Sequence, residues 1–222
     1  MKKIYIGLCI VLGIIIIACL AIFLRTNKFG DNIRFKKEHE SFNGTISESG
    51  KVVRNINISK NNPFKYITAK KLIKEMENKK SFIIYFGFAK CPWCRSMLPT
   101  LIDVAKEQGI SKIYYLDILD IRDKLSVDEN NKIVSEKRGT DEYYVLLALF
   151  NDVLDDYELT DKDGNKVDAN EKRIYAPNVV KVENGIPVKL TTGLSDKQTG
   201  AYDELTEEIN KDMYNKLIDL VK

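Results

Sequence analysis

Two cysteines separated by two residues, Cys91 and Cys94, are the side chains of this sequence best suited to chemistry. Thiols at this spacing can close a small disulfide when the backbone brings both sulfurs together. A β-type apolar run at residues 81–88 precedes the pair, and residues 95–106 have the pattern of a helix. A strand, a short loop, a CxxC motif and a helix, in that order, indicate redox chemistry rather than metal binding.

The position of the two cysteines at the start of a helix predicts different roles for them. Unpaired backbone N–H groups and the helix dipole stabilise a thiolate there, so we expect Cys91 to be the attacking thiol. Pro92 fits the first helical position, where the N–H it lacks would be unpaired anyway. Arg95 is expected to add positive charge beside the thiolate. Cys94 lies one turn further on and is expected to be covered, as the resolving thiol.

A zinc site and a structural disulfide are the rival interpretations of the motif. A zinc site needs about four ligands, but the other candidates are Cys9 and Cys19, in an apolar run, and the single histidine, His39. A bridge across two residues closes almost no loop and contributes little stability. The sequence therefore predicts a redox-active pair, with no metal and no other cofactor.

Around the motif the chain resembles the thioredoxin superfamily. The resemblance is carried by Cys91 to Cys94 followed by Pro99, a proline inside the active-site helix. It implies an α/β fold in which helices flank a central mixed sheet. It also implies a cis-proline facing the motif, for which Pro177 is the candidate, with the backbone of Ala176 pairing with an extended substrate. By the same resemblance Pro92 and Trp93 contact substrate, and Trp93 forms an apolar lip. An ordinary trans loop proline is the alternative for Pro177.

Two positions depart from the superfamily pattern. Tyr85 stands where many thioredoxins hold a buried carboxylate that moves protons for the resolving thiol, and Lys90 precedes the first cysteine in place of tryptophan. Fast general disulfide reduction is therefore not implied. Residues 86–94 and 114–117 are more similar to membrane-anchored thioredoxin-like proteins of Gram-positive bacteria, some of which are called bacteriocin transport accessory proteins. The resemblance covers residues 64–222.

The remaining patterns predict the elements that position the motif. We expect a helix capped by Thr68 and ending near residue 78, core strands at 82–86 and 112–117, and a hairpin around Asn184-Gly185. Apolar residues three and four apart predict a last helix over 201–221. An insertion at about 120–172 is expected to hold a helix over 141–155 and a turn at Asp163-Gly164. Alternation at 51–58 indicates an edge strand.

The amino-terminal end predicts a membrane anchor. Residues 1–3 form a basic tail, residues 4–24 are apolar and uncharged, and residues 25–62 form a polar juxtamembrane segment before a domain at 63–222. The apolar run is long enough to cross a bilayer as a single helix, and no A-x-A-type site follows it. Lipidation of Cys19 is a weaker alternative, because Ile17 is large and residues 20–24 stay apolar.

Two features of the sequence give opposite predictions for the orientation of the anchor. The basic residues that follow the apolar run outnumber those before it, which by the positive-inside rule would keep the domain in the cytoplasm. A very short basic start followed by an apolar run is typical of exported and anchored chains, and the family resemblance agrees. We therefore expect a single-pass protein of the cell membrane whose carboxyl-terminal domain is extracytoplasmic.

Charge composition restricts the class of function. Charged residues make up 30% of the chain with a net charge of only +3, which argues against a nucleic-acid binder with a clustered basic surface. The expected function is thiol–disulfide exchange with protein thiols and disulfides at the outer face of the membrane, together with a redox partner protein. The alternative is a non-catalytic accessory or docking protein of a membrane export system. A peroxide-reducing enzyme is a third, weaker hypothesis.

Overall fold

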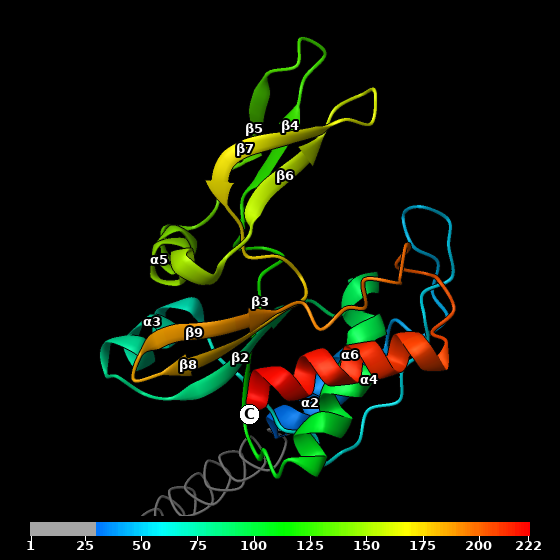
Figure 1. Cartoon of the computed structure of the whole chain (residues 1–222), viewed down its shortest axis with the longest axis vertical. Helices are drawn as coiled ribbons and strands as arrows, with labels where there is room; N and C mark the ends of the chain where they lie inside the picture. The colour runs from blue at the N-terminus through cyan, green and yellow to red at the C-terminus, as the bar shows by residue number, and fades with distance from the viewer. Residues whose placement is uncertain (1–29) are drawn as a thin grey trace, which may run out of the picture.

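A computed structural model describes residues 30–222 as an α/β fold in which helices cover both faces of a mixed sheet (Figure 1). Within that range no helix combines the length and apolar character needed to span a bilayer. The expected anchor at residues 4–24, with Cys9 and Cys19, lies outside the described residues.

Five strands form the central sheet, in the order β1-β3-β2-β8-β9. The first three run parallel to one another, β8 is antiparallel to β2, and β9 returns antiparallel to β8. The turn between the last two strands is Asn184-Gly185, and both residues have positive φ, as the expected hairpin requires. The strands are β1 (Phe64–Tyr66), β2 (Phe82–Gly87), β3 (Ile113–Asp117), β8 (Asn178–Glu183) and β9 (Ile186–Thr191).

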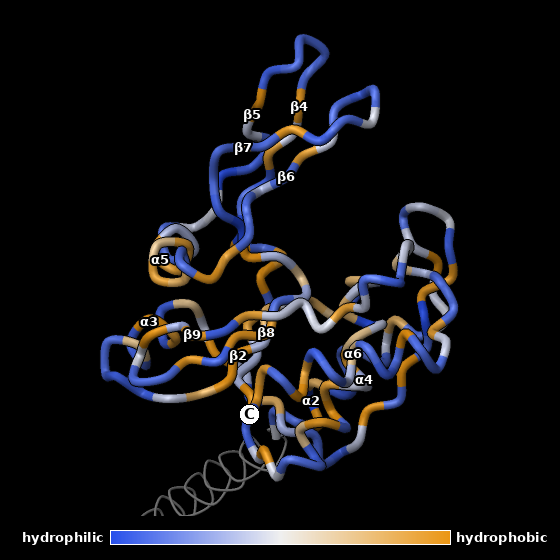
Figure 2. Tube along the Cα trace, viewed as in Figure 1, coloured by the Kyte–Doolittle hydropathy of each residue, from blue (hydrophilic) through white to orange (hydrophobic). Residues whose placement is uncertain are grey.

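Side chains of β2 alternate between two apolar clusters, one on each face of the sheet. Tyr85 belongs to the cluster beneath α2 (Asp31–Glu40), α4 (Pro92–Glu107) and α6 (Glu207–Val221). Ile84 and Phe86 belong to the cluster beneath α3 (Ala69–Glu77) and α5 (Asp141–Phe150). Hydrophobic stretches of the trace lie in the strands of the sheet and along parts of the helices that cover it (Figure 2). The sheet is thus buried on both faces, which explains the nearly continuous apolar sequence of β2.

Three helices begin at a threonine whose side chain accepts a hydrogen bond from the backbone N–H three residues further on. Thr68 caps α3 as expected, Thr140 caps α5 and Thr206 caps α6. The expectation that the last helix starts at residue 201 was wrong, because the cap lies at Thr206. The helix expected over 141–155 ends at Phe150 and continues only as a short 3-10 turn, Asn151–Val153.

The insertion also carries two hairpins that project from the body, here called the hairpin extension (residues 124–137 and 156–172). They are β4 (Lys124–Val127) with β5 (Ile133–Lys137), and β6 (Asp156–Thr160) with β7 (Lys166–Lys172). Their own apolar cluster is small and centres on Tyr157, Leu159 and Ala169. The turn at Asp163-Gly164 is confirmed, with Gly164 at positive φ. The first hairpin was not anticipated.

The described part of the expected juxtamembrane segment packs as part of the domain. Phe35 of α2 is completely buried in the cluster beneath α4, where it stacks on Phe64 with ring centroids 4.0 Å apart. The domain therefore begins before the expected boundary at residue 63. The edge strand expected at residues 51–58 is absent from the described residues, where only an isolated bridge joins Ile46 and Val52.

Candidate redox site

Helix α4 begins at the CxxC motif, directly after the loop that leaves β2. Cys91 is its N-cap residue, and the Cys91 sulfur accepts a hydrogen bond from the backbone N–H of Cys94 over 3.2 Å. Pro92 occupies the first helical position, and Pro99 lies inside the helix. The motif therefore has the placement expected from the sequence, with unpaired helix N–H groups beneath the first sulfur.

The loop before β8 faces the same sulfur. The Ala176–Pro177 peptide bond is cis, which confirms the expectation for Pro177. The Cys91 thiol donates a hydrogen bond to the Ala176 carbonyl over 3.3 Å. Residues 85 positions apart in the sequence thus meet at one point, with the backbone of Ala176 directly beside the Cys91 sulfur.

Both cysteines are free thiols and both are covered. Cys91 is 2% exposed and Cys94 is 1% exposed, whereas Pro92 and Trp93 are half-buried. We expected Cys94 to be covered, but not Cys91. Another molecule can therefore reach the Cys91 sulfur only if the contacts around it open. Trp93 packs against the edge of the buried cluster beneath α4, as an apolar lip would.

Opposing effects set the pKa of Cys91. Burial raises it, but hydrogen bonds from the Cys94 thiol and the Cys94 backbone, together with the positive charge of Arg122, outweigh that effect. The net result is a pKa below the ordinary value for a thiol. Burial raises the pKa of Cys94 well above its ordinary value, and the neighbouring Cys91 reinforces this. The two thiols thus differ in acidity, and Cys91 is the one that ionises more readily.

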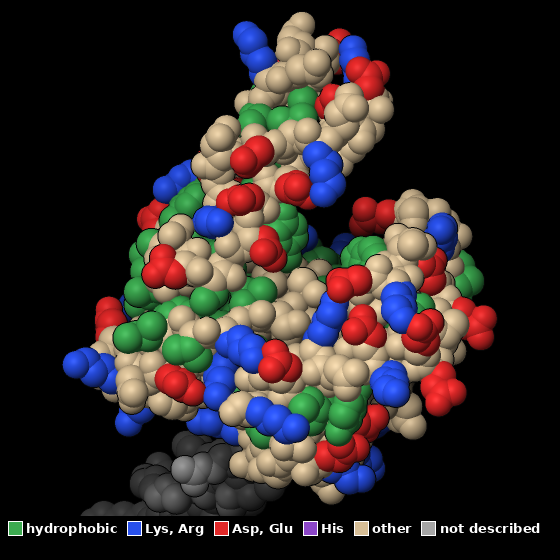
Figure 3. Space-filling view, in the orientation of Figure 1, with side chains coloured by type: hydrophobic (Ala, Val, Ile, Leu, Met, Phe, Trp, Pro, Cys, Tyr) green, Lys and Arg blue, Asp and Glu red, His purple; other side chains and the backbone are tan. Residues whose placement is uncertain are grey.

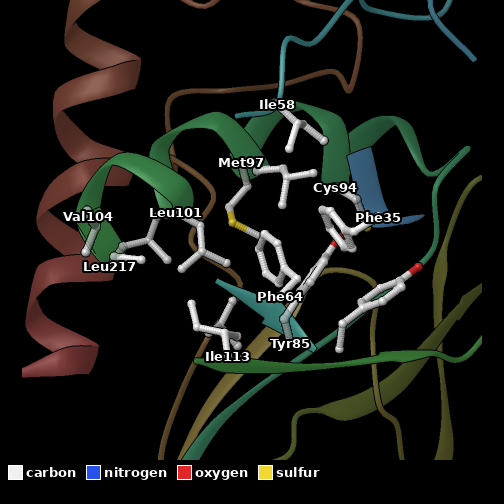
Figure 4. Close-up of a cluster of buried hydrophobic side chains, with 14 of the residues drawn as sticks. Phe35, Ile58, Phe64, Tyr85, Cys94, Met97, Leu101, Val104, Ile113 and Leu217 are labelled. Carbon is white, nitrogen blue, oxygen red and sulfur yellow. The ribbon is translucent and has the colours of Figure 1, made fainter. Parts of the chain in front are cut away.

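Tyr85 lies beneath the second thiol, among the side chains that face α4 (Figure 4). Its hydroxyl is buried without a well-aligned hydrogen-bond partner, but it faces Cys94 and acts to lower the pKa of that thiol. Gly87 makes room for it, because a Cβ at that position would overlap the Tyr85 hydroxyl. The position that holds a carboxylate in many thioredoxins is thus occupied by a buried hydroxyl, and burial raises the pKa of Tyr85 well above its ordinary value.

Arg95 does not have the role expected from the sequence. Its side chain is completely buried and donates to the backbone carbonyls of Arg54, His39 and Ala89 over 2.8, 2.7 and 3.1 Å, and to the Asn43 side chain. These acceptors belong to the loop before the motif and to the segment that includes α2. Cys91 is the N-cap residue and has an extended, non-helical backbone, so the rule that residues four apart on a helix are neighbours does not bring Arg95 beside its sulfur. Arg95 instead ties the amino-terminal segment to α4.

The cation that acts on Cys91 is Arg122, which the sequence did not single out. It follows β3 in the chain, is half-buried, and lies over the Phe88 ring with its guanidinium carbon 5.1 Å from the centroid. Its charge contributes to the low pKa of Cys91. Nothing in the local pattern around residue 122 marks it, because its proximity to the motif depends on the pairing of β3 with β2.

Within residues 30–222 no group of three or more His, Cys, Asp or Glu side chains is placed to hold a metal ion. A comparison of the chain with models of known protein families and with curated proteins finds no match. The arrangement can therefore be interpreted only from its own chemistry: a dithiol with one lowered and one raised pKa, at a helix start, facing a cis-proline loop.

Proposed function

We propose that this chain is a thioredoxin-like thiol–disulfide oxidoreductase that exchanges disulfides with proteins. The observation that carries the proposal is the placement of Cys91, which caps α4 and faces Ala176 at the cis-proline loop. A mixed sheet with α4 and α6 on one face and α3 on the other supports the thioredoxin-like interpretation.

In the reductive direction, the Cys91 thiolate attacks one sulfur of a substrate disulfide. The substrate S–S bond breaks, a Cys91–substrate bond forms, and the other substrate sulfur leaves as a thiolate that takes up a proton. Cys94 loses its proton and attacks the Cys91 sulfur, which releases the second substrate thiol. Two electrons pass to the substrate and the Cys91–Cys94 disulfide forms; a protein dithiol returns the site to its reduced form. The reverse sequence oxidises a substrate dithiol.

The site of action in the proposal is the outer face of the cell membrane. Its support is the uncharged apolar run at residues 4–24 after a short basic tail. Fusion of a reporter enzyme that is active only outside the cytoplasm to residue 222 tests the orientation. Activity of the fusion agrees with the proposal, and an inactive, stably produced fusion contradicts this part of it.

Trapping tests the exchange reaction itself. In a full-length chain with Cys9 and Cys19 replaced by alanine, Cys94→Ser should accumulate mixed disulfides with cell proteins, because the resolving thiol is missing. Cys91→Ser is the matched control and should accumulate none, since burial keeps Cys94 protonated. Mixed disulfides at equal levels in both variants would contradict the assigned roles.

The 2% exposure of Cys91 favours one alternative, a docking or sensing protein of an export system with little turnover. That alternative predicts no mixed disulfides from Cys94→Ser, together with a Cys91–Cys94 redox state that stays unchanged when purified protein disulfides are added.

A further inference from the structure

A cavity of about 500 Å³ opens beside the CxxC motif, between the end of β3, the loop before the cis-proline and the base of the hairpin extension. In the space-filling view a hollow separates the hairpin extension from the loops near residues 50 and 200, above the amino end of α4 (Figure 3). Basic side chains dominate the lining of the cavity, which contains Lys90, Arg122, Lys124, Lys137 and Arg173 against the acids Asp120 and Asp123.

Most of these cations already have partners. Arg173 forms a buried ion pair with Asp123 over 2.9 Å, and Lys137 donates to the backbone carbonyl of Asp120 over 2.5 Å. Lys124 pairs with Glu136, on the hairpin extension, over 2.5 Å. These contacts hold the wall of the cavity in place.

Arg122 is different, because among residues 30–222 no acceptor for its guanidinium is found. It is half-buried against the Phe88 ring. A neighbouring cation, Arg173, repels its positive charge. A guanidinium that is partly withdrawn from water and has no protein acceptor loses part of its hydration, and a ligand carboxylate would compensate for that loss. Lys90 adds a second available charge, since the one ion pair it makes within residues 30–222 is with Glu48, whose side chain is 95% exposed.

The cavity adjoins the path of a reacting polypeptide. Lys90 immediately precedes Cys91, and Arg173 lies three residues before Ala176, whose carbonyl contacts the Cys91 sulfur. A substrate segment that lies along Ala176 with its sulfur at Cys91 therefore passes the mouth of the cavity. A side chain one or two residues from the substrate cysteine can reach inside, since each residue of an extended chain spans about 3.3 Å.

We propose that this cavity selects protein substrates that carry an aspartate or glutamate within two residues of the reacting cysteine, with Arg122 as the carboxylate-binding group. The planar guanidinium matches a carboxylate through two parallel hydrogen bonds. This inference rests on the proposed function and names the substrate class of the same site.

Peptide disulfides test the inference. Three peptide homodimers, each joined by a single disulfide, carry Glu, Gln or Lys beside an otherwise identical cysteine context. Excess reduced full-length protein with Cys9 and Cys19 replaced by alanine reduces each dimer, and released peptide thiol is measured. Each rate is divided by the rate at which dithiothreitol reduces the same dimer, because neighbouring charge also changes intrinsic disulfide reactivity.

The expected result is that the Glu dimer reacts roughly three- to tenfold faster than the Gln dimer at low salt and the Lys dimer slowest, with the differences shrinking as salt is added. In Arg122→Met the Glu-to-Gln ratio should fall to about one, whatever the general loss of rate. Lys132→Met, an exposed charge removed at the turn between β4 and β5, is the matched control and should keep the ratio.

Equal corrected rates for all dimers in the unmodified protein would overturn the inference and leave the oxidoreductase function standing. A Glu preference that survives in Arg122→Met would also overturn it, because the preference would then arise elsewhere. A protein that reduces none of the dimers would count against the proposed function itself.

Discussion

Two regions next to the CxxC motif each contain an arginine in a confined place, and the two arginines behave differently. Beneath the amino end of α4, Arg95 is completely buried and donates hydrogen bonds to four residues. In the cavity beside the motif, Arg122 is half-buried and, among residues 30–222, has no hydrogen-bond acceptor. The comparison indicates that a cation whose bonds are already made supports the fold, and one left without acceptors is available for chemistry.

The difference follows from where the acceptors come from. Those of Arg95 belong to the protein's own backbone and to Asn43, so removing the guanidinium would leave buried carbonyls without donors. In the part of the chain that the structure describes, no carbonyl depends on the Arg122 side chain for its hydrogen bond, and this side chain contributes to the lowered pKa of Cys91. Mutation of Arg95 should therefore change mainly the stability of the fold, and mutation of Arg122 should change mainly the reactivity of Cys91.

The largest effect is expected for Arg95→Met. Loss of its hydrogen bonds should lower the free energy of unfolding by about 3 kcal/mol, measured by urea denaturation. Arg95→Lys should recover only part of this, because an ammonium cannot reproduce the forked geometry of the guanidinium. Arg122→Met is the matched control and should remain within about 1 kcal/mol of the unmodified protein. An equal loss of unfolding free energy in both methionine variants would contradict the distinction between the two arginines.

The next effect concerns His39, which packs in the same region as Arg95. His39 is completely buried, stacks on Phe35 and shares a hydrogen bond with the Phe35 carbonyl; burial lowers its pKa from 6.5 to about 4. Between these two pH values the unfolded chain binds a proton that the folded chain does not. Stability should therefore fall as the pH drops from about 6.5 to about 4, by about 3 kcal/mol in total.

His39→Phe provides the comparison for that slope, because it keeps a ring in the stack and removes the titrating group. His39 is the single histidine of the chain, so the difference between the two pH–stability curves isolates its contribution. The two curves should separate progressively below about pH 6.5, as measured by urea denaturation at a series of pH values. Parallel curves would show that His39 has the same pKa in the folded protein as in the unfolded chain.

A smaller effect is expected for Arg122→Met in the rate of Cys91 alkylation. Removing the positive charge raises the pKa of Cys91, so less thiolate is present at pH 7. The rate with iodoacetamide should fall roughly fivefold, equivalent to about 1 kcal/mol. Lys132→Met should leave it unchanged. Arg95→Met also removes a positive charge, and under conditions where it stays folded it should react faster than Arg122→Met. A larger loss of reactivity in folded Arg95→Met than in Arg122→Met would instead assign the effect on Cys91 to Arg95.

Local signals in the sequence were sufficient for the parts of the site that neighbouring residues determine. The strand before Cys91, the proline at the first helical position and the Asn184-Gly185 turn were all predicted, because each depends on a few adjacent residues. Pro177 was found only through the resemblance to thioredoxins, since nothing within its own segment requires a cis bond.

Features that depend on distant contacts were missed. Helix α2 is strongly polar, and only Phe35 and His39, four residues apart, are buried, so its amphipathic pattern is weak. Strand β5 is exposed along its whole length and lacks alternation. The roles of Arg95 and Arg122 depend on which segments fold against them, and a residue's distance from Cys91 along the chain does not reveal that. Proximity in the sequence favoured Arg95 as the cation beside Cys91. In the structure, the pairing of β3 with β2 places Arg122 near Cys91 instead.

The smallest effect is expected for Tyr85→Phe, which tests whether the hydroxyl beneath the CxxC motif affects the reaction of Cys94. The Tyr85 hydroxyl acts to lower the pKa of Cys94 against the effect of burial, so its removal should leave Cys94 harder to ionise. The mixed disulfide formed with a peptide substrate should then be resolved roughly two- to threefold more slowly in rapid acid-quench measurements, while the initial attack by Cys91 keeps its rate.

Stability should change by about 0.5 kcal/mol or less, because the lost hydroxyl has no well-aligned partner to leave behind. Tyr143→Phe is the matched control, since it removes another buried hydroxyl on the opposite face of the sheet and should leave resolution unchanged. Slower resolution only in Tyr85→Phe would show that the Tyr85 hydroxyl takes part in the reaction, although the buried cluster around it otherwise serves the fold. Equal resolution in both variants would restrict the chemistry to Cys91, Cys94 and the Arg122 cavity.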